Sequence, residues 1–73
     1  MKAINILELQ PGMVVNFYGA KFEIETTKIV RYENDDVMCA LGRWLEGSIV
    51  PGYFGPNKGW NFQGNHHVTH YID

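Results

Sequence analysis

No stretch of about 12 residues in this chain carries helical periodicity, and short runs with a period of two take its place. Residues 13–18 alternate in this way, which is typical of a strand with one face buried. The spacing of Asn5 and Glu8 is that of a capping box, but Pro11 and Gly12 limit any helix there to one turn. The sequence therefore predicts an all-β or mainly β domain.

A second strand is expected from position 21 or 22 to position 32, after a two-residue turn at Gly19-Ala20 of the type that needs glycine first. Within it, Ile29 and Val30 break the alternation that Phe22 begins. A β-bulge near Thr27-Lys28 would return the apolar side chains to one face.

The run Glu33-Asn34-Asp35-Asp36 is the clearest turn signal in the chain. It predicts a third strand over 37–45, in which Gly42 marks a second bulge. The alternative for 37–45 is a helix, because Leu41 and Leu45 are four residues apart. Residues 60–63 and 68–72 would complete a set of four or five short strands.

The length of 73 residues predicts one small domain, 1–73, which buries only about 60% of the surface of its unfolded chain. The single cysteine, Cys39, fits a reducing compartment, and its alternating apolar surroundings favour a buried thiol. We find no membrane-length apolar run and no signal-peptide pattern. We therefore expect a cytoplasmic protein whose fold is a strongly bent antiparallel sheet, an SH3-like or OB-like barrel.

The opening of the chain resembles that of SH3-like barrels such as the N-terminal domains of elongation factor P relatives. The shared features are Pro11-Gly12-Met13 leading into a strand, the hairpin glycine Gly19, and the F-x-I pattern of Phe22 to Ile24. The resemblance covers about a third of the chain. It implies a fold and an interaction module and transfers no functional residue.

The segment 47–65 contains five of the eight glycines, two of the three prolines and four of the ten aromatic residues. Such a segment is too apolar for a solvated linker. Tyr53 and Phe54, between two Pro/Gly pairs, are expected to be exposed anchors for a partner protein, with Trp44 and Trp60 as further candidates. Trp60 and Phe62 alternate within a candidate strand, which places them mainly in the core.

The run Lys58-Gly59-Trp60-Asn61-Phe62 is similar to the K-G-F-G-F segment of cold-shock domains. That resemblance implies base stacking on Trp60 and Phe62 and a phosphate contact from Lys58. Arg43 is a further candidate phosphate contact. The alternative function is therefore binding of single-stranded RNA or DNA. The net charge of −2, with scattered basic residues, argues against duplex DNA.

Metal binding and catalysis are not indicated. In a strand, His66 and His70 would be about 13 Å apart, too far to share an ion, and His67 would face the other side. Cys39 lacks the polar setting of a nucleophile. We expect no cofactor, no metal and no enzymatic activity.

A small acidic domain without catalytic groups acts by occupying a surface. We therefore expect a regulator or adaptor that binds a protein, of the kind that bacteriophages direct at host machinery such as RNA polymerase. A structural subunit of a phage or bacterial assembly is a further alternative.

Overall fold

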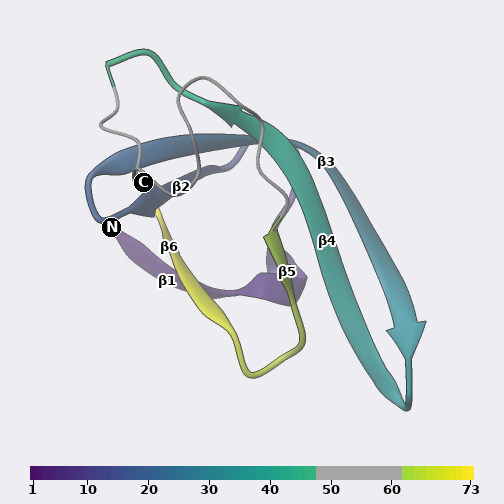
Figure 1. Ribbon diagram of the computed structural model, residues 1–73. Helices are drawn as coiled ribbons and strands as arrows, with labels where there is room; N and C mark the ends of the chain where they lie inside the picture. The colour runs from purple at the N-terminus through teal and green to yellow at the C-terminus, as the bar shows by residue number, and fades with distance from the viewer. Residues whose placement is uncertain (48–61) are drawn as a thin grey trace.

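The computed structural model describes residues 1–47 and 62–73, which form one six-stranded antiparallel sheet (Figure 1). The strand order is β1-β6-β2-β3-β4-β5. In chain order the elements are β1 (Lys2–Asn5), the 3-10 turn η1 (Ile6–Glu8), β2 (Val14–Phe17), β3 (Ala20–Tyr32), β4 (Asp35–Trp44), β5 (Phe62–Gly64) and β6 (Thr69–Ile72).

The predicted all-β class is confirmed, with one strand more than expected. The extra strand is β1, which pairs antiparallel with β6 at the edge of the sheet. The helical alternative for 37–45 is wrong, because these residues lie in β4 and at its end. Within the described residues β1 and β5 are the two ends of the sheet and do not pair with each other, so the sheet is strongly bent without closing into a barrel.

The predicted capping box is present at η1. The side chain of Asn5 accepts a hydrogen bond from the backbone of Leu7 at 3.0 Å, and Glu8 accepts one from the backbone of Asn5 at 3.3 Å. Asn5 also donates to the carbonyl of His66 at 2.6 Å. The N-terminal residues are thus docked against the turn before β6.

Both tight hairpin turns have two central residues with positive φ. Glu33 and Asn34 form the expected turn between β3 and β4. The turn between β2 and β3 differs from the prediction, because its central residues are Tyr18 (φ 53°) and Gly19 (φ 93°) rather than Gly19-Ala20. The pairing of Phe17 with Ala20 leaves Tyr18 and Gly19 in the loop, and a two-residue turn with two positive φ values matches the twist of the flanking strands.

The register of β3 against β4 shifts once, between Ile24 and Thr26. The bulge is thus earlier than the expected Thr27-Lys28 site, and it lies beside Gly42, which pairs with Ile24. Gly42 is in the partner strand of this bulge and marks no second register shift in β4. A side chain at position 42 would overlap the backbone of Glu23, so the close approach of the strands needs glycine there.

The core lies along the first half of β3, where this strand pairs with β2 on one side and with the end of β4 on the other. Phe22 is fully buried at its centre, and its ring contacts those of Trp44 and Phe62 edge-on, with centroids 5.1 and 4.8 Å away. The other buried apolar residues are Ile4, Ile6, Leu9, Val15, Ala20, Ile24, Met38 and Ala40.

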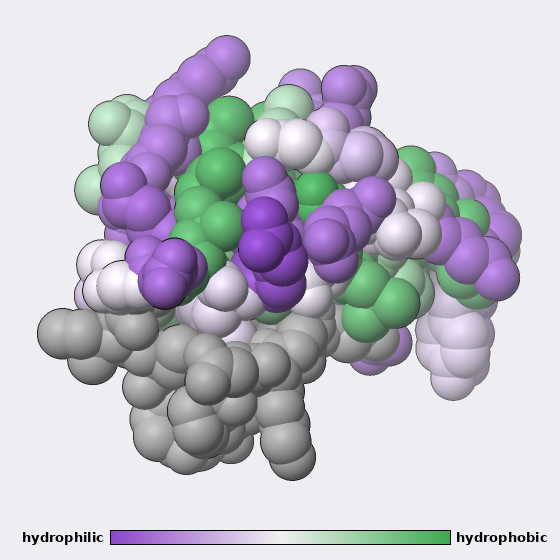
Figure 2. Space-filling model, turned by 90° about the horizontal axis from the view of Figure 1, so that it is seen from above, coloured by the Kyte–Doolittle hydropathy of each residue, from purple (hydrophilic) through white to green (hydrophobic). Residues whose placement is uncertain are grey.

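Beyond the bulge, β3 and β4 continue as a hairpin that projects from the rest of the sheet (Figure 1). We call this hairpin the arm, and it comprises residues 26–41. It gives the molecule its long dimension of 38 Å, against 23 and 20 Å for the other two. In Figure 2 the arm is the lobe on the right, where hydrophobic and hydrophilic residues adjoin.

Candidate protein-binding surface

The most exposed aromatic side chain among the described residues is Tyr18, at 97%. It occupies the first central position of the β2–β3 turn, where positive φ is unfavourable for a bulky residue. The turn is fixed locally, because the side-chain oxygen of Asn16 accepts a hydrogen bond from the backbone of Gly19 at 2.8 Å. Tyr18 is therefore held outward on an ordered turn.

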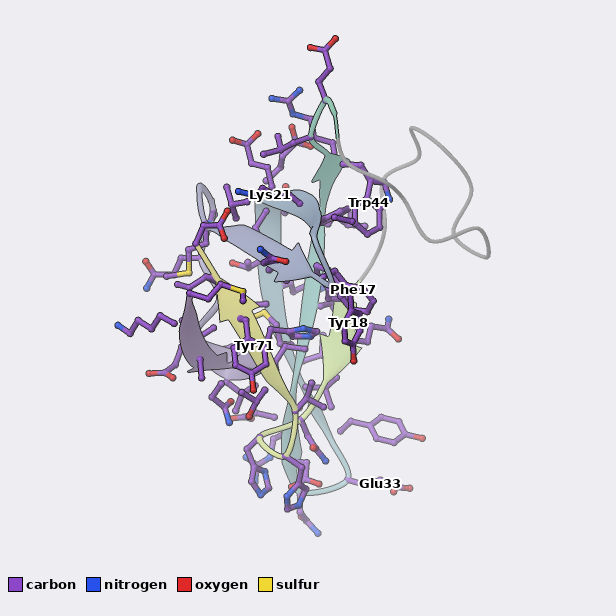
Figure 3. The ribbon with its side chains drawn as sticks, turned by 90° about the vertical axis from the view of Figure 1, so that its left-hand side faces the viewer. Phe17, Tyr18, Lys21, Glu33, Trp44 and Tyr71 are labelled. Carbon is purple, nitrogen blue, oxygen red and sulfur yellow. The ribbon has the colours of Figure 1, made fainter. Side chains whose placement is uncertain are left out.

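Tyr18 borders a hollow of about 390 Å³. Figure 3 shows Tyr18 beside Phe17, with Tyr71 on the neighbouring strand β6. We call this region the Tyr18 surface; its lining among the described residues is Met1, Asn16, Phe17, Tyr18, Gly19, Thr69, His70 and Tyr71. Aromatic rings and a methionine make the lining suitable for an apolar side chain.

Phe17 and His70 join this surface to the core. The ring of Phe17 lies 5.5 Å from that of Tyr18 and 6.2 Å from that of Phe62. The ring of His70 lies 4.9 Å from that of Phe62. Burial lowers the pKa of His70 below its ordinary value of 6.5, which favours the neutral imidazole.

The C-terminal residue secures the neighbouring edge of the surface. The Asp73 carboxylate forms an ion pair with Lys21 at 2.5 Å and accepts a hydrogen bond from Asn16 at 3.3 Å. These two hydrogen bonds, from Lys21 first and then Asn16, lower the pKa of Asp73. Asn16 therefore contacts both the Tyr18 turn and the end of β6.

The structure places two of the candidate binding residues in the core. Trp44 is only 7% exposed and packs on Phe22, so it supports the sheet rather than offering an anchor. Phe62 is 2% exposed, which agrees with the expectation that it fills the core. A side chain buried to this degree has no face available to stack on a base.

Arg43 is exposed, but its guanidinium faces two carboxylates. It donates to Glu23 at 3.1 Å and lies 3.7 Å from a carboxylate oxygen of Glu25. This pairing disfavours a phosphate at the same site. The other candidate residues, Tyr53, Phe54, Lys58 and Trp60, lie outside the described residues.

His66 and His67 lie in the turn before β6, and their ring centroids are 4.0 Å apart. The strand expected over 68–72 begins one residue later, at Thr69, and contains His70. Within residues 1–47 and 62–73, no group of three or more His, Cys, Asp or Glu is placed to hold a metal ion. No helix in the same part of the chain is long and apolar enough to cross a membrane.

Sequence reasoning missed Tyr18 because it assigned this residue to the preceding strand. The available signal was the pair Tyr18-Gly19 between two alternating runs, since a glycine at the second central position suits a turn with two positive φ values. Moving the turn one residue earlier would have exposed Tyr18 at the hairpin end.

These features define the class of the protein, a small all-β domain built on one open antiparallel sheet with an apolar surface at one hairpin turn. Comparison with known proteins adds no closer assignment, since no family model, curated protein or solved structure matches the chain.

Proposed function

We propose that this chain is a small non-catalytic regulator or adaptor that binds a partner protein through the Tyr18 surface. The observation that supports the proposal is the placement of Tyr18, 97% exposed at a positive-φ position. Such a backbone conformation costs on the order of 1 kcal/mol for a bulky residue, and it clusters at functional sites. Tyrosine on a rigid support is also among the commonest binding hot spots.

The partner would insert an apolar side chain into the hollow while Tyr18 and Tyr71 cover its flanks. Such binding acts by blocking a surface or holding one conformation of the partner. Bacterial RNA polymerase, approached in the manner of a bacteriophage modulator, is the first partner that we propose. Tyr53 and Phe54 are proposed as additional anchors.

The test is capture of purified bacterial RNA polymerase, alongside a bacterial lysate, by the immobilised wild-type chain and by the Tyr18→Ala variant. Loss of a hot-spot tyrosine should weaken binding by about 2 kcal/mol, about 30-fold in Kd. Tyr32→Ala is the matched control, because Tyr32 is also an exposed tyrosine but lies at the far end of the arm. Equal capture by the wild type and both variants would refute the role of the Tyr18 surface.

The same purified chain can be used to distinguish binding of single-stranded nucleic acid from binding of a partner protein. Stacking on Trp60 beside a phosphate contact from Lys58 would quench indole fluorescence on adding an oligonucleotide, with a strong dependence on salt. The burial of Phe62 and the pairing of Arg43 with Glu23 leave this alternative with less support than protein binding.

A further inference from the structure

The arm has an open backbone edge. Beyond the bulge, β3 pairs only with β4 among the described residues. Because the two-residue turn joins Tyr32 and Asp35, these residues exchange hydrogen bonds, and the pattern alternates back along the arm. The N–H and C=O groups of Thr27, Ile29 and Arg31 therefore point away from β4, as a template for another strand.

We propose that two copies of this chain form a symmetric dimer by pairing their arms antiparallel along this edge of β3, with the two-fold axis at Val30. A two-fold axis makes the same segment contact itself in both copies. In an antiparallel pair, directly opposite residues lie on the same face of the sheet. The two-fold axis must therefore pass through a residue of β3 and not between two residues, which limits it to a few positions.

Charge selects among these positions. An axis at Lys28 or at Arg31 would place each of these cations opposite its own copy. An axis at Ile29 would place Lys28 opposite the partner's Val30, whereas the Val30 axis places it opposite the partner's Tyr32, whose ring attracts an ammonium group. An axis closer to the core is obstructed, because the backbone groups of Ile24 are already bonded to Gly12 and Met13. Among the residues of β3, the Val30 axis places no like charges opposite each other.

With the axis at Val30, the outer face of the joined arms becomes a continuous apolar row. Val37 already lies opposite Val30 across the hairpin, and Val30 would meet the partner's Val30. The side chain of Val30 is 38% exposed without the partner, and the pairing would cover it. Lys28 would lie opposite the partner's Tyr32, where an ammonium group and an aromatic ring attract each other.

The inner face is equally compatible. Ile29, which is 52% exposed, would lie opposite the partner's Arg31. The guanidinium of Arg31 is held by Asp36 at 3.2 Å, so its aliphatic stem is available to cover an apolar neighbour. Thus both large apolar residues of the β3 edge would gain cover in one register.

The shape of the molecule permits this arrangement. The arm projects from the core (Figure 1), so the antiparallel pairing would direct the two cores to opposite ends. Tyr18 in the turn before β3 and Glu33 in the turn after it lie at opposite ends of this long strand, and Figure 3 labels both residues. The dimer would therefore present two Tyr18 surfaces at its two ends.

Cysteine cross-linking tests the register directly. In a Cys39→Ser background, Val30→Cys would face its own copy at a non-hydrogen-bonded pair, with Cα atoms about 4.5 Å apart, within the range of a disulfide. We expect a covalent dimer on mild oxidation. Lys28→Cys, on the same face and also exposed, is the control and should stay largely uncross-linked because it lies opposite the partner's Tyr32. Equal cross-linking of both variants would refute the register.

Sedimentation of the unmodified chain between about 1 and 100 µM tests association itself. We expect the wild type to be a dimer. Ile29→Lys should be a monomer, because the new lysine would face the partner's Arg31. Ile29→Lys combined with Arg31→Glu should form the dimer again, because opposite charges then face each other. Leu41→Lys, an exposed change away from the β3 edge, should remain dimeric. A wild type that is monomeric throughout would overturn the proposal and leave the edge to a strand of another protein. These measurements need no partner protein, so their outcome is independent of the Tyr18 experiment.

Discussion

Gly42 of β4 lies directly against Glu23 of β3, so closely that a Cβ atom at position 42 would overlap the Glu23 carbonyl oxygen and lie 2.8 Å from the ring of Phe22. The strands approach this closely immediately beside the β3 bulge, where the sheet bends and the arm begins. The glycine therefore positions both the core and the arm.

Gly42→Ala should destabilise the fold by about 1–3 kcal/mol, because the backbone must move to admit the methyl group. Urea unfolding followed by tryptophan fluorescence measures the change. Leu41→Ala is the matched control, since Leu41 is exposed and adjacent in the strand. Equal stability of Gly42→Ala and the wild type would contradict the close approach.

Tyr18→Asn should raise the stability of the domain by up to about 1 kcal/mol, because asparagine tolerates positive φ better than tyrosine. For a domain of this size, that corresponds to a rise in Tm of about 4–8 °C. The same variant should bind the partner protein less well. Thermal unfolding and partner capture, measured on one preparation, should thus change in opposite directions.

Glu33→Asn is the control for the second hairpin turn, where Glu33 also has positive φ, at 47°. It should increase thermal stability in the same way without changing partner capture, because Glu33 lies at the arm tip. A loss of capture in Glu33→Asn would mean that the partner contacts the arm rather than the Tyr18 surface.

The fold class followed from local patterns, whereas the exact turns and the candidate site did not. The capping box of Asn5 and the Glu33-Asn34 turn depend on neighbouring residues, so the sequence was enough to predict them. The pairing of β1 with β6 depends on contacts more than 60 residues apart in the chain, which a local pattern does not contain.

The bulge shows the same limit at shorter range. The alternation of apolar residues indicated that a bulge before Ile29 must return the apolar side chains of β3 to one face. A bulge at any of several positions would have satisfied that pattern. Gly42 on the opposite strand selects the actual place, because only there can the backbones approach so closely. Likewise Tyr18 became a candidate only once its turn and the hollow beside it were positioned by β6.

Phe62→Ala should cost about 3–5 kcal/mol, because it removes a buried ring that contacts Phe17, Phe22 and His70. A loss of this size would unfold much of a small domain. Phe62→Leu keeps most of the apolar volume and should retain the folded sheet, as measured by circular dichroism and urea unfolding. If Phe62→Ala were as stable as the wild type, its ring would not be part of the core.

The stability of the protein should fall as the pH is lowered from about 7 toward 5, and His70 should be responsible for part of the fall. Burial lowers the pKa of His70 in the folded state, whereas in the unfolded chain the imidazole titrates near 6.5. Below that pH the unfolded chain therefore binds more protons, so protonation favours unfolding until the pH has passed the folded pKa.

His70→Gln should flatten the profile of stability against pH between the folded and unfolded pKa of His70, measured by urea unfolding at a series of pH values. His67→Gln, at an exposed position in the preceding turn, is the matched control and should keep the slope of the wild type. An unchanged slope in His70→Gln would show that burial of this imidazole does not govern the acid sensitivity.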